Sequence, residues 1–402
     1  MPKVAQTVIT KENAQRFLVL RQGFLQDKGD KDGTLDAVKR LGCVQVDPIN
    51  VVHRNQHLVL YNRVNNYRTL YLEELLYKDR RVFEYWCNEK SIVPVEELHY
   101  FRYRMQNSME FQSPYYDHVK ARRKQLQVPI AKIISEIKAH GPLSAQELEQ
   151  RREIRIRTIT DILNLLWDCG DLMIHHVEGN RRYYDLAEHM LSSSTKIETP
   201  SREEYEQFMI RKYMRAYGLV DSRDWRFGWL PMKAPKRKTI IRDMIEENEL
   251  YPIKIEGVKQ EYCVLKDLFD SLDLDTPIDE RTFFIAPLDN LLWNRKVISE
   301  VFDFDYAWEV YKVPEKRIHG YYVMPILCGT RFIGRLDPKL DRQNKKMIIN
   351  SLSITDKPVS RIIIDELVMS LRRFCEFHDV SDISIQKTQP LELKRALERE
   401  LA

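Results

Sequence analysis

The segment that says most about the fold is residues 128–186, which read VPIAKIISEIKAHGPLSAQELEQRREIRIRTITDILNLLWDCGDLMIHHVEGNRRYYDL. Apolar residues at helical spacing from Ile130 to Ala139 predict an amphipathic helix, which ends at Gly141. Ser144 followed three residues later by Glu147 forms a capping box, which is a typical start of a second helix.

The second half of this segment predicts a third helix and a hairpin. Residues 158–169 have helical spacing and end at a glycine. Two short strands, 172–177 and 182–186, then flank a turn centred on glycine, with Arg181 and Arg182 at its tip. Three helices followed by a hairpin is the order of a winged helix, in which the hairpin is the wing.

Regions on both sides of this segment repeat parts of the same order. Toward the N-terminus the patterns predict helices over 11–25, 34–41 and 50–65, with a strand over 43–47. Toward the C-terminus they predict helices over 203–217 and 237–248, a short helix capped by Ser222, and strands over 251–256 and 261–265. We therefore expect two further winged-helix units.

The last part of the chain has a different character. Turn residues separate stretches that read as strands, over 281–288, 307–312, 321–327, 331–337 and 347–354, before a helix over 359–378. The expected fold class is α+β, with three tandem winged-helix units and a β-barrel-like C-terminal domain. The expected boundaries are 1–125, 126–195, 196–275 and 276–402.

Composition excludes a disordered chain, a collagen-like fibre and a disulfide scaffold. The 402 residues include 43% hydrophobic residues, enough for packed cores, and 64 Lys and Arg against 60 Asp and Glu. This near-neutral balance does not exclude a nucleic-acid partner, because a partner responds to local charge. The N-terminus lacks the pattern of a secretory signal, and no apolar run approaches the ~20 residues of a membrane span. A cytoplasmic protein without a membrane partner is expected.

Metal and cofactor sites are not expected. The six cysteines are scattered, which argues against a zinc ribbon and for core thiols. His53 and His57 are four residues apart, but the metalloprotease motif needs Glu where this chain has Arg54.

A candidate active site lies at Gln45-Val46-Asp47. In a strand alternate residues face the same side, so Gln45 and Asp47 should point outward together. Pro48 ends the strand, which would leave Asp47 at its rim. A carboxylate beside an amide can bind and orient a water molecule. The alternative is that both residues merely belong to the solvated face of a strand.

Three longer stretches carry a resemblance to a known family. They are Leu41–Asp47 with Asn50–Val52 and His57, Pro287–Arg295 with Phe304–Tyr306, and Gly320–Pro325 with Gly334–Lys339 and Asp341-Arg342. In order and spacing they resemble the winged-helix DNA glycosylases of the AlkZ/YcaQ type, relatives of the azinomycin-resistance glycosylase, in the subgroup with a Gln-x-Asp motif.

The resemblance implies a fold, a reaction and a site. The fold would be three winged helices and a β-barrel in a C shape around a DNA channel. The reaction would be monofunctional removal of N7-alkylated purines, and the Gln-x-Asp subgroup is associated with unhooking of interstrand crosslinks. Gln45 and Asp47 would be catalytic, and the protein would act as a monomer in base excision repair.

The residues independently suit that chemistry. Alkylation at N7 makes the purine a cationic leaving group, and the transition state resembles an oxocarbenium ion. An ionised Asp47 could stabilise that cation and accept a proton from water. Gln45 cannot titrate, so its expected role is to position water or the carboxylate. The motif holds no lysine for a Schiff base, which fits hydrolysis.

Double-stranded DNA with alkylated or crosslinked purines is the expected partner. Clustered cations can release counterions from phosphates, although a solvated surface with interspersed acids would look similar. The residues expected to contact DNA are Arg54, His57, Arg181, Arg182, Arg335, Lys339 and Arg342.

Two other functions stay open at this point. A winged-helix regulator would bind DNA without catalysis, and fold alone cannot distinguish it from an enzyme. A scaffold in a repair complex has no separate support in the sequence. The Gln45 and Asp47 pair and the C-terminal stretches favour the enzyme.

Overall fold

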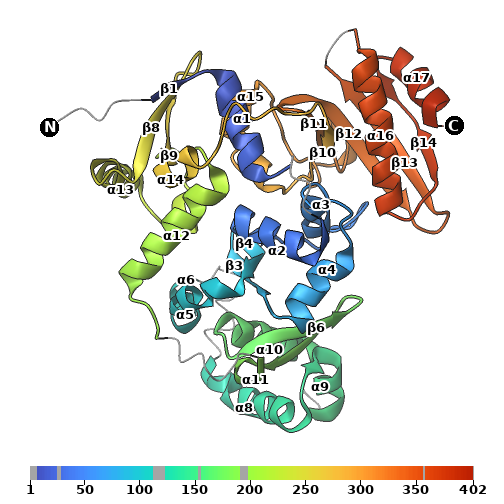
Figure 1. Ribbon diagram of the computed structural model, residues 1–402. Coiled ribbons are helices and arrows are strands. Elements are labelled where there is room, and N and C mark those ends of the chain that lie inside the picture. The colour runs from blue at the N-terminus through green and yellow to red at the C-terminus, as the bar shows by residue number, and fades with distance from the viewer. Residues whose placement is uncertain are drawn as a thin grey trace. The chain divides into compact units, whose positions relative to one another are not determined.

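The structure is a computed structural model (Figure 1) and describes residues 7–24, 29–111, 123–152, 155–190, 198–355 and 358–401. Two compact units share the chain. Unit 1 comprises residues 1–72, 86–92 and 210–402, and unit 2 comprises residues 73–85 and 93–209.

Unit 2 contains residues 128–186. Its elements run in the order α8 (Arg123–His140), β5 (Leu143–Ser144), α9 (Ala145–Arg152), α10 (Ile156–Asp168), β6 (Leu172–Glu178) and β7 (Arg181–Leu186). The three strands form one sheet in the order β5-β7-β6. This is the predicted order of helices and hairpin, with one additional short strand.

Local sequence signals explain the element boundaries in this segment. The Glu147 carboxylate accepts hydrogen bonds from the Ser144 amide and hydroxyl, both at 2.8 Å, so the predicted capping box is present. Gly141 and Gly170 follow α8 and α10 with φ of 79° and 75°, a conformation that favours glycine. Ile159, Ile162 and the rest of the apolar face of α10 are buried.

Unit 2 also contains η1 (Glu74–Lys78), η2 (Val95–Glu97), α5 (Leu98–Gln106), α6 (Ser108–Phe111) and α11 (Ala187–Met190). The strands β3 (Val82–Cys87) and β4 (Glu89–Pro94) are divided between the units, because residues 86–92 belong to unit 1.

The N-terminal part of unit 1 is helical. Its elements are α1 (Lys11–Gln22), α2 (Asp30–Leu41), β2 (Val44–Gln45), α3 (Asn55–Tyr61) and α4, which runs from Thr69 to Glu73. Thr10 caps α1 by accepting a hydrogen bond from the Asn13 amide. The predicted strand over 43–47 is shortened to two residues, which pair antiparallel with Ile92 and Ser91 of β4.

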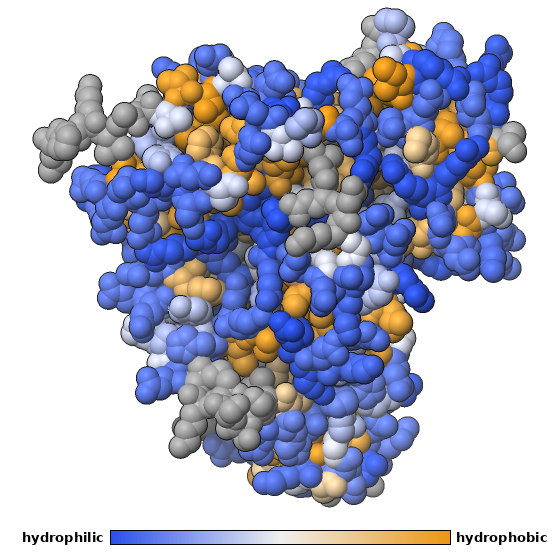
Figure 2. Space-filling view, viewed as in Figure 1, coloured by the Kyte–Doolittle hydropathy of each residue, from blue (hydrophilic) through white to orange (hydrophobic). Residues whose placement is uncertain are grey.

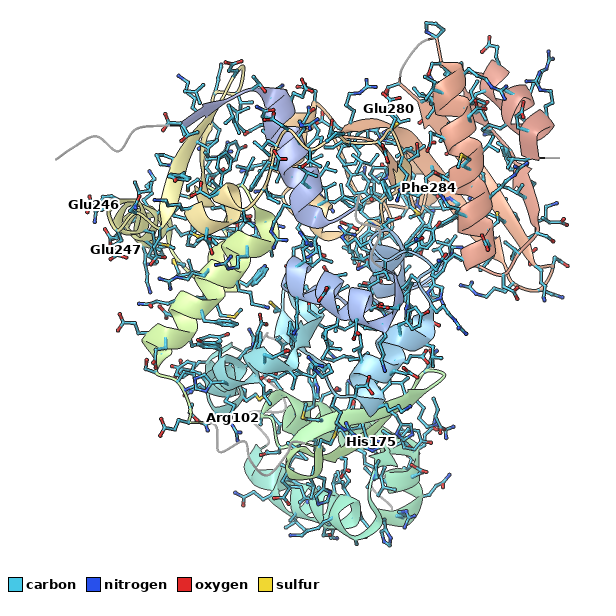
Figure 3. The ribbon with its side chains drawn as sticks, viewed as in Figure 1. Arg102, His175, Glu246, Glu247, Glu280 and Phe284 are labelled. Atoms are coloured by element: carbon cyan, nitrogen blue, oxygen red, sulfur yellow. The ribbon has the colours of Figure 1, made fainter. Side chains whose placement is uncertain are left out.

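A three-stranded sheet joins the N-terminus to the middle of the chain. β1 (Thr7–Ile9) pairs in parallel with β8 (Leu250–Ile255), which pairs antiparallel with β9 (Glu261–Leu265). α12 (Arg202–Tyr217), α13 (Ala234–Glu246) and α14 (Lys266–Asp270) flank these strands in the chain (Figure 1). The C-terminal end of α13 is marked by Glu246 in Figure 3.

The short helix predicted at Ser222 is absent, and this prediction was wrong. Asp221 and Asp224 accept hydrogen bonds from the backbone amides two residues on and from the guanidiniums of Arg223 and Arg226. Such local bonds compete with helical ones. Only a 3-10 turn, η4 (Phe227–Trp229), forms there.

The C-terminal part of unit 1 is a curled sheet with helices on it. The strands follow the order β10 (Thr282–Phe284), β11 (Met324–Cys328), β12 (Arg331–Asp341), β13 (Lys346–Ile354) and β14 (Asp382–Ile385), and β15 (Thr388–Gln389) also pairs with β13. α16 (Arg361–Phe377) and α17 (Glu392–Leu401) cover one face of this sheet (Figure 1). Among the described strands β10 and β14 are not paired with each other, so the predicted barrel-like domain is an open half-barrel.

The predicted strand over 307–312 was also wrong. The segment between α15 (Arg295–Phe302) and β11 contains a turn at Val310-Tyr311 and a 3-10 helix, η6 (Pro314–Lys316), because Glu309 and Pro314 direct the backbone into turns. In this C-terminal part, α15, β14, β15 and α17 were also missed.

The surface is mostly hydrophilic on the face shown in Figure 2, with apolar side chains in separate clusters. Within the described ranges no helix is both long and apolar enough to cross a membrane.

Candidate active site

The Gln-x-Asp motif lies where β2 ends in unit 1. Gln45 is the last residue of this strand, and the Val46 amide still donates to the Lys90 carbonyl at 2.8 Å before the chain leaves the sheet. Gln45 is only 8% exposed, so the expectation that it faces outward beside Asp47 was wrong for this residue. β2 contains only two residues, so the chain leaves the sheet before the alternation of a longer strand can orient Asp47.

Buried donors from distant segments hold the backbone of this motif. The Asn290 amide donates to the Cys43 carbonyl at 2.9 Å, and the Asn55 amide donates to the Gln45 carbonyl at the same distance. The ammonium group of Lys212, 4% exposed, donates to the Gly42 carbonyl. Because three elements fix three carbonyls, the position of Gln45 and Asp47 depends on the whole of unit 1 rather than on β2.

Asp47 is half-buried in a turn of its own. Its Oδ1 accepts a hydrogen bond from the Ile49 amide at 2.8 Å. Burial raises the pKa of the Asp47 carboxyl above its ordinary value, and the bond from Ile49 opposes that shift. The carboxylate also lies close enough to Tyr322 to contribute to the raised pKa of that phenol, after the larger effect of burial. A partly desolvated carboxylate of this kind is suited to act on a cation or a proton.

The segment after Asp47 is tied to the C-terminal sheet. Arg342, just past β12, donates to Asn50 Oδ1 at 2.6 Å and to the Val52 carbonyl at 2.9 Å. The Leu340 amide of β12 donates to the Val51 carbonyl at 3.3 Å. Arg342, predicted as a DNA contact, therefore also positions the segment that follows the motif.

The stretch Pro287–Arg295 contributes a buried ion pair beside the motif. Asp289, fully buried, accepts two hydrogen bonds from the Arg63 guanidinium, each 2.8 Å long. The same carboxylate caps η5 (Asn290–Leu292) through the Leu291 amide. The pair thus fixes the turn from which Asn290 reaches the Cys43 carbonyl. The carbonyl of Phe284, labelled in Figure 3, accepts from the Asn62 amide one residue before Arg63.

Two of the predicted DNA contacts are built into the protein. His57 is 8% exposed, its Nδ1 is 2.9 Å from the Tyr67 hydroxyl, and burial lowers its pKa to about 3. A buried, neutral imidazole is a poor phosphate ligand, so this placement corrects the prediction for His57. Arg335 packs its guanidinium 4.2 Å from the centre of the Phe304 ring and donates to the Asp305 carbonyl.

The β6–β7 hairpin of unit 2 and the end of β12 carry further candidates. Arg182 donates to Glu84 at 2.9 Å within unit 2, so its charge is already paired. Arg181 is exposed at the start of β7, and its Nη1 lies 3.4 Å from the Tyr183 hydroxyl. Lys339 is exposed on β12, and Arg54 is partly exposed just before α3. Arg54, Arg181 and Lys339 remain candidates for contact with phosphates.

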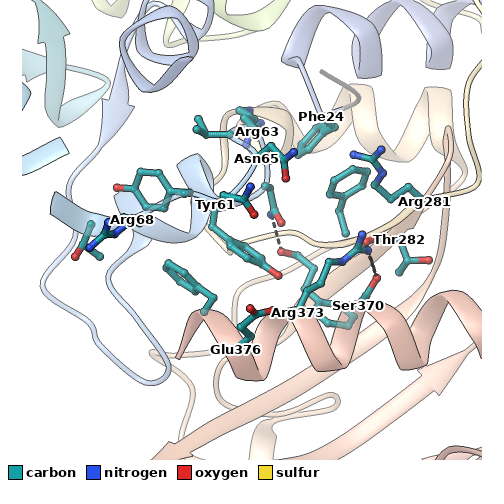
Figure 4. Close-up of a pocket in the computed structure, with 18 residues that line it drawn as sticks. Phe24, Tyr61, Arg63, Asn65, Arg68, Arg281, Thr282, Ser370, Arg373 and Glu376 are labelled. Carbon is teal, nitrogen blue, oxygen red and sulfur yellow. Dashed lines mark hydrogen bonds between the residues drawn. The ribbon is translucent and has the colours of Figure 1, made fainter. Parts of the chain in front are cut away.

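One cavity in unit 1 is separate from the motif. It measures about 520 Å³ and lies between α3, β10 and α16 in unit 1 (Figure 4). The stacked rings of Tyr61 and Phe377, with centres 4.5 Å apart, line it beside Arg68 and Arg373. Neither Gln45 nor Asp47 belongs to its lining. Within the described ranges no three His, Cys, Asp or Glu side chains are grouped so as to hold a metal ion.

Comparisons with known proteins show the class of protein to which this chain belongs. Residues 38–377 match the profile of a DNA glycosylase family, which makes the protein an enzyme that acts on DNA. The chain belongs to the AlkZ-like DNA glycosylase family. The match begins in α2 and ends with α16, so it includes both the motif and the C-terminal sheet.

A solved structure shares the fold. The chain is similar to the Streptomyces sahachiroi DNA glycosylase AlkZ, with a TM-score of 0.64 and 16% identity over 95% of this chain and 100% of that chain. The family and the mixed α+β fold predicted from the sequence are thereby confirmed, and so is the expectation of a glycosylase rather than a non-catalytic regulator.

Several residues that build the site carry little signal in the sequence. Asn290 and Asp289 lay inside a stretch quoted for the resemblance, which was their only signal. Asn55 and Lys212 had none, because their roles depend on carbonyl groups elsewhere in the fold.

Proposed function

We propose that this glycosylase hydrolyses the N-glycosidic bond of N7-alkylated purines in double-stranded DNA, with Asp47 and Gln45 as the catalytic residues. The observation that carries the proposal is the half-buried carboxylate of Asp47, held beside a motif whose backbone is fixed by buried donors. We further propose that the enzyme is monofunctional and works as a monomer without a cofactor.

Asp47 would stabilise the positive charge on the sugar and accept the proton of the attacking water. Its ionised carboxylate stabilises the positive charge that develops on the deoxyribose as the bond to the purine lengthens. A water oxygen forms a bond to C1′, and the C1′–N9 electron pair leaves with the purine and neutralises its charge. The water proton moves to the Asp47 carboxylate and is later released to solvent. The products are the free alkylpurine and an abasic site.

Gln45 would have a supporting role. Its amide cannot titrate and can donate and accept at once, so it can orient the attacking water. Gln45 is 8% exposed, so the surrounding protein restricts its side chain. A restricted amide needs little reorganisation to hold the water when DNA binds.

Crosslinked purines are a second proposed substrate class. A crosslinked base is tethered to the opposite strand and cannot turn out of the helix into a deep pocket. This substrate class therefore requires that Gln45 and Asp47 act on the base in an open site. A concave channel for the duplex is part of this proposal.

The test is excision from a duplex that contains a single N7-methylguanine, followed as alkali-labile sites under single-turnover conditions. We expect Asp47→Asn to lower the rate by roughly 10²–10⁴-fold, while binding of the duplex persists. Asp279→Asn serves as the matched control, because it neutralises an exposed carboxylate of unit 1 outside the motif.

The pH profile gives a second readout. The wild-type rate should fall as pH drops through the raised pKa of Asp47, because protonation removes the negative charge. Absence of product from the wild type, or undiminished product from Asp47→Asn, would overturn the proposed mechanism. A duplex with an N7-to-N7 interstrand crosslink, run in parallel, decides the second substrate class.

A further inference from the structure

The segment between α15 and β11 exposes large apolar side chains. Residues 308–321, here called the 308–321 loop, include Tyr311 at 84% exposure, Ile318 at 77% and Val313 at 53%. These three side chains form its apolar tip. Three exposed apolar side chains of this size on one short loop are a candidate contact surface.

The loop is held in one shape by a buried carboxylate. Glu309, 1% exposed, accepts hydrogen bonds from the amides of Ile318 and His319 at 2.9 and 2.8 Å and from the Lys312 ammonium at 2.8 Å. These bonds lower the pKa of Glu309 to about 2, despite its burial. The apolar tip is therefore presented by a turn that is already ordered before any partner binds, which reduces the entropy lost on contact.

The loop and the catalytic segment share an anchor. The Tyr322 amide, just after the loop, donates to Asp337 Oδ1 on β12 at 2.9 Å. Three residues further along β12, the Leu340 amide donates to the Val51 carbonyl of the segment after Asp47. At ~3.3 Å per residue, the two anchor points are about 10 Å apart along one strand. That separation spans about three stacked base pairs.

Net charge near the tip favours a polyanion, because Lys316 and Arg317 outnumber the exposed carboxylate of Glu315. Lys316 is exposed at the turn, and the Arg317 guanidinium lies 4.8 Å from the centre of the Tyr321 ring. The Arg317 Nε also donates to the Lys312 carbonyl, which fixes this cation at the base of the tip. Apolar side chains flanked by cations are the combination with which proteins enter a base stack while contacting its phosphates.

We propose that the 308–321 loop is a wedge that inserts its apolar tip into the base stack of duplex DNA beside the lesion. The inference rests on the proposed function of the Gln45 and Asp47 site. Insertion by Tyr311 or Ile318 offsets the loss of stacking and exposes the glycosidic bond to Asp47, without a pocket for the base.

The test compares two substrates with one pair of variants. The tip variant Tyr311→Ala/Ile318→Ala is matched by Ile362→Ala/Leu391→Ala, which removes two apolar side chains of 61% and 81% exposure elsewhere in unit 1. The substrates carry N7-methylguanine either paired with cytosine or opposite an abasic site, where less stacking must be disrupted. The tip variant should excise the paired lesion at least tenfold more slowly than wild type and the unpaired lesion within about threefold of it. The matched variant should be unchanged on both.

A second measurement does not depend on catalysis. 2-Aminopurine is placed next to the lesion, and its fluorescence is recorded on binding of Asp47→Asn protein with and without the tip substitutions. Unstacking by the wedge should raise the signal only when the tip is intact.

The outcomes separate the two proposals. Equal loss on both substrates, or an unchanged fluorescence rise without the tip, would overturn the wedge. Lack of excision by the wild type would overturn the proposed function, while the fluorescence result would still decide the wedge. Equal melting temperatures of wild type and tip variant exclude misfolding as the cause.

Discussion

At the residue scale, Asp47 combines a local signal with a distant environment. The Gln-x-Asp spacing could be found in the sequence, and Pro48 correctly indicated that the strand does not continue past Asp47. The environment of Asp47 could not be found, because it includes residues far along the chain, such as Tyr322, which lies close enough to interact electrostatically with the Asp47 carboxylate. The same limit applies to Asn290, whose acceptor Cys43 is 247 residues away.

The buried pair of Arg63 and Asp289 leads to a prediction on stability. Side-chain exposures of 1% and 0% mean that removal of either partner leaves an uncompensated buried charge. We expect Arg63→Met to lower the free energy of unfolding by about 3–5 kcal/mol. Urea unfolding, followed by circular dichroism, measures the change.

The exposed pair of Arg242 and Asp243 supplies the control. Its side chains are 63% and 47% exposed, so Arg242→Met should cost less than about 1 kcal/mol. The double variant Arg63→Met/Asp289→Leu should lose less than the sum of the single variants. If the Arg63 variant unfolds at the wild-type urea concentration, the ion pair has no structural role.

At the element scale, the segment between β2 and α3 depends on α16. The His53 ring lies 5.5 Å from Phe377 and 6.1 Å from His378, measured between ring centres. It also lies 4.6 Å from His57. These histidines are neutral in the folded protein, because burial lowers the pKa of His53 and His378 to about 4 and of His57 to about 3.

This cluster predicts a loss of stability in mild acid. Between pH 6.5 and about 4 the unfolded chain takes up protons that the folded cluster does not, so the folded state loses relative stability as pH falls. Glu309, with its lowered pKa, contributes a loss only below about pH 4.5. Melting temperatures of the wild type should fall from pH 7 to pH 4.5, and His53→Gln should show a smaller fall. Parallel curves for the two proteins would contradict this assignment.

The sequence predicted elements well where local signals were complete. The capping box at Ser144, the glycine stops and the apolar face of α10 define their helices without outside help. Prediction failed where side chains bond the backbone locally, as with Asp224 and Glu309. It also missed β14, whose pairing in parallel with β13 requires the intervening α16.

At the scale of the whole molecule, a formal charge of +4 conceals cations in different states. Lys339 is exposed, whereas Arg182 is paired with Glu84. Only a cation that can reach phosphate releases counterions when DNA binds.

The exposed Lys339 and the paired Arg182 should contribute differently to the salt dependence of DNA binding. Lys339→Ala should lower the magnitude of the slope of log Kd against log salt by about 1. The paired substitution Arg182→Gln/Glu84→Gln should leave the slope unchanged, because it removes a charge that does not contact phosphate. Fluorescence anisotropy with labelled duplex between 50 and 200 mM salt, about the range over which such slopes develop, measures both. Equal slopes for the two variants would remove Lys339 from the DNA contacts.

The parallel pairing of β1 with β8 has a consequence for synthesis of the chain. Ile9 pairs with Ile255, so the first strand leaves the ribosome 246 positions (255 minus 9) before its neighbour. At about 5–20 residues per second, that strand waits roughly 12–50 seconds without a partner. During this time Thr7–Ile9 is an unpaired edge that can associate with other nascent chains. The sheet of β1, β8 and β9 can form only after translation has passed the middle of the chain.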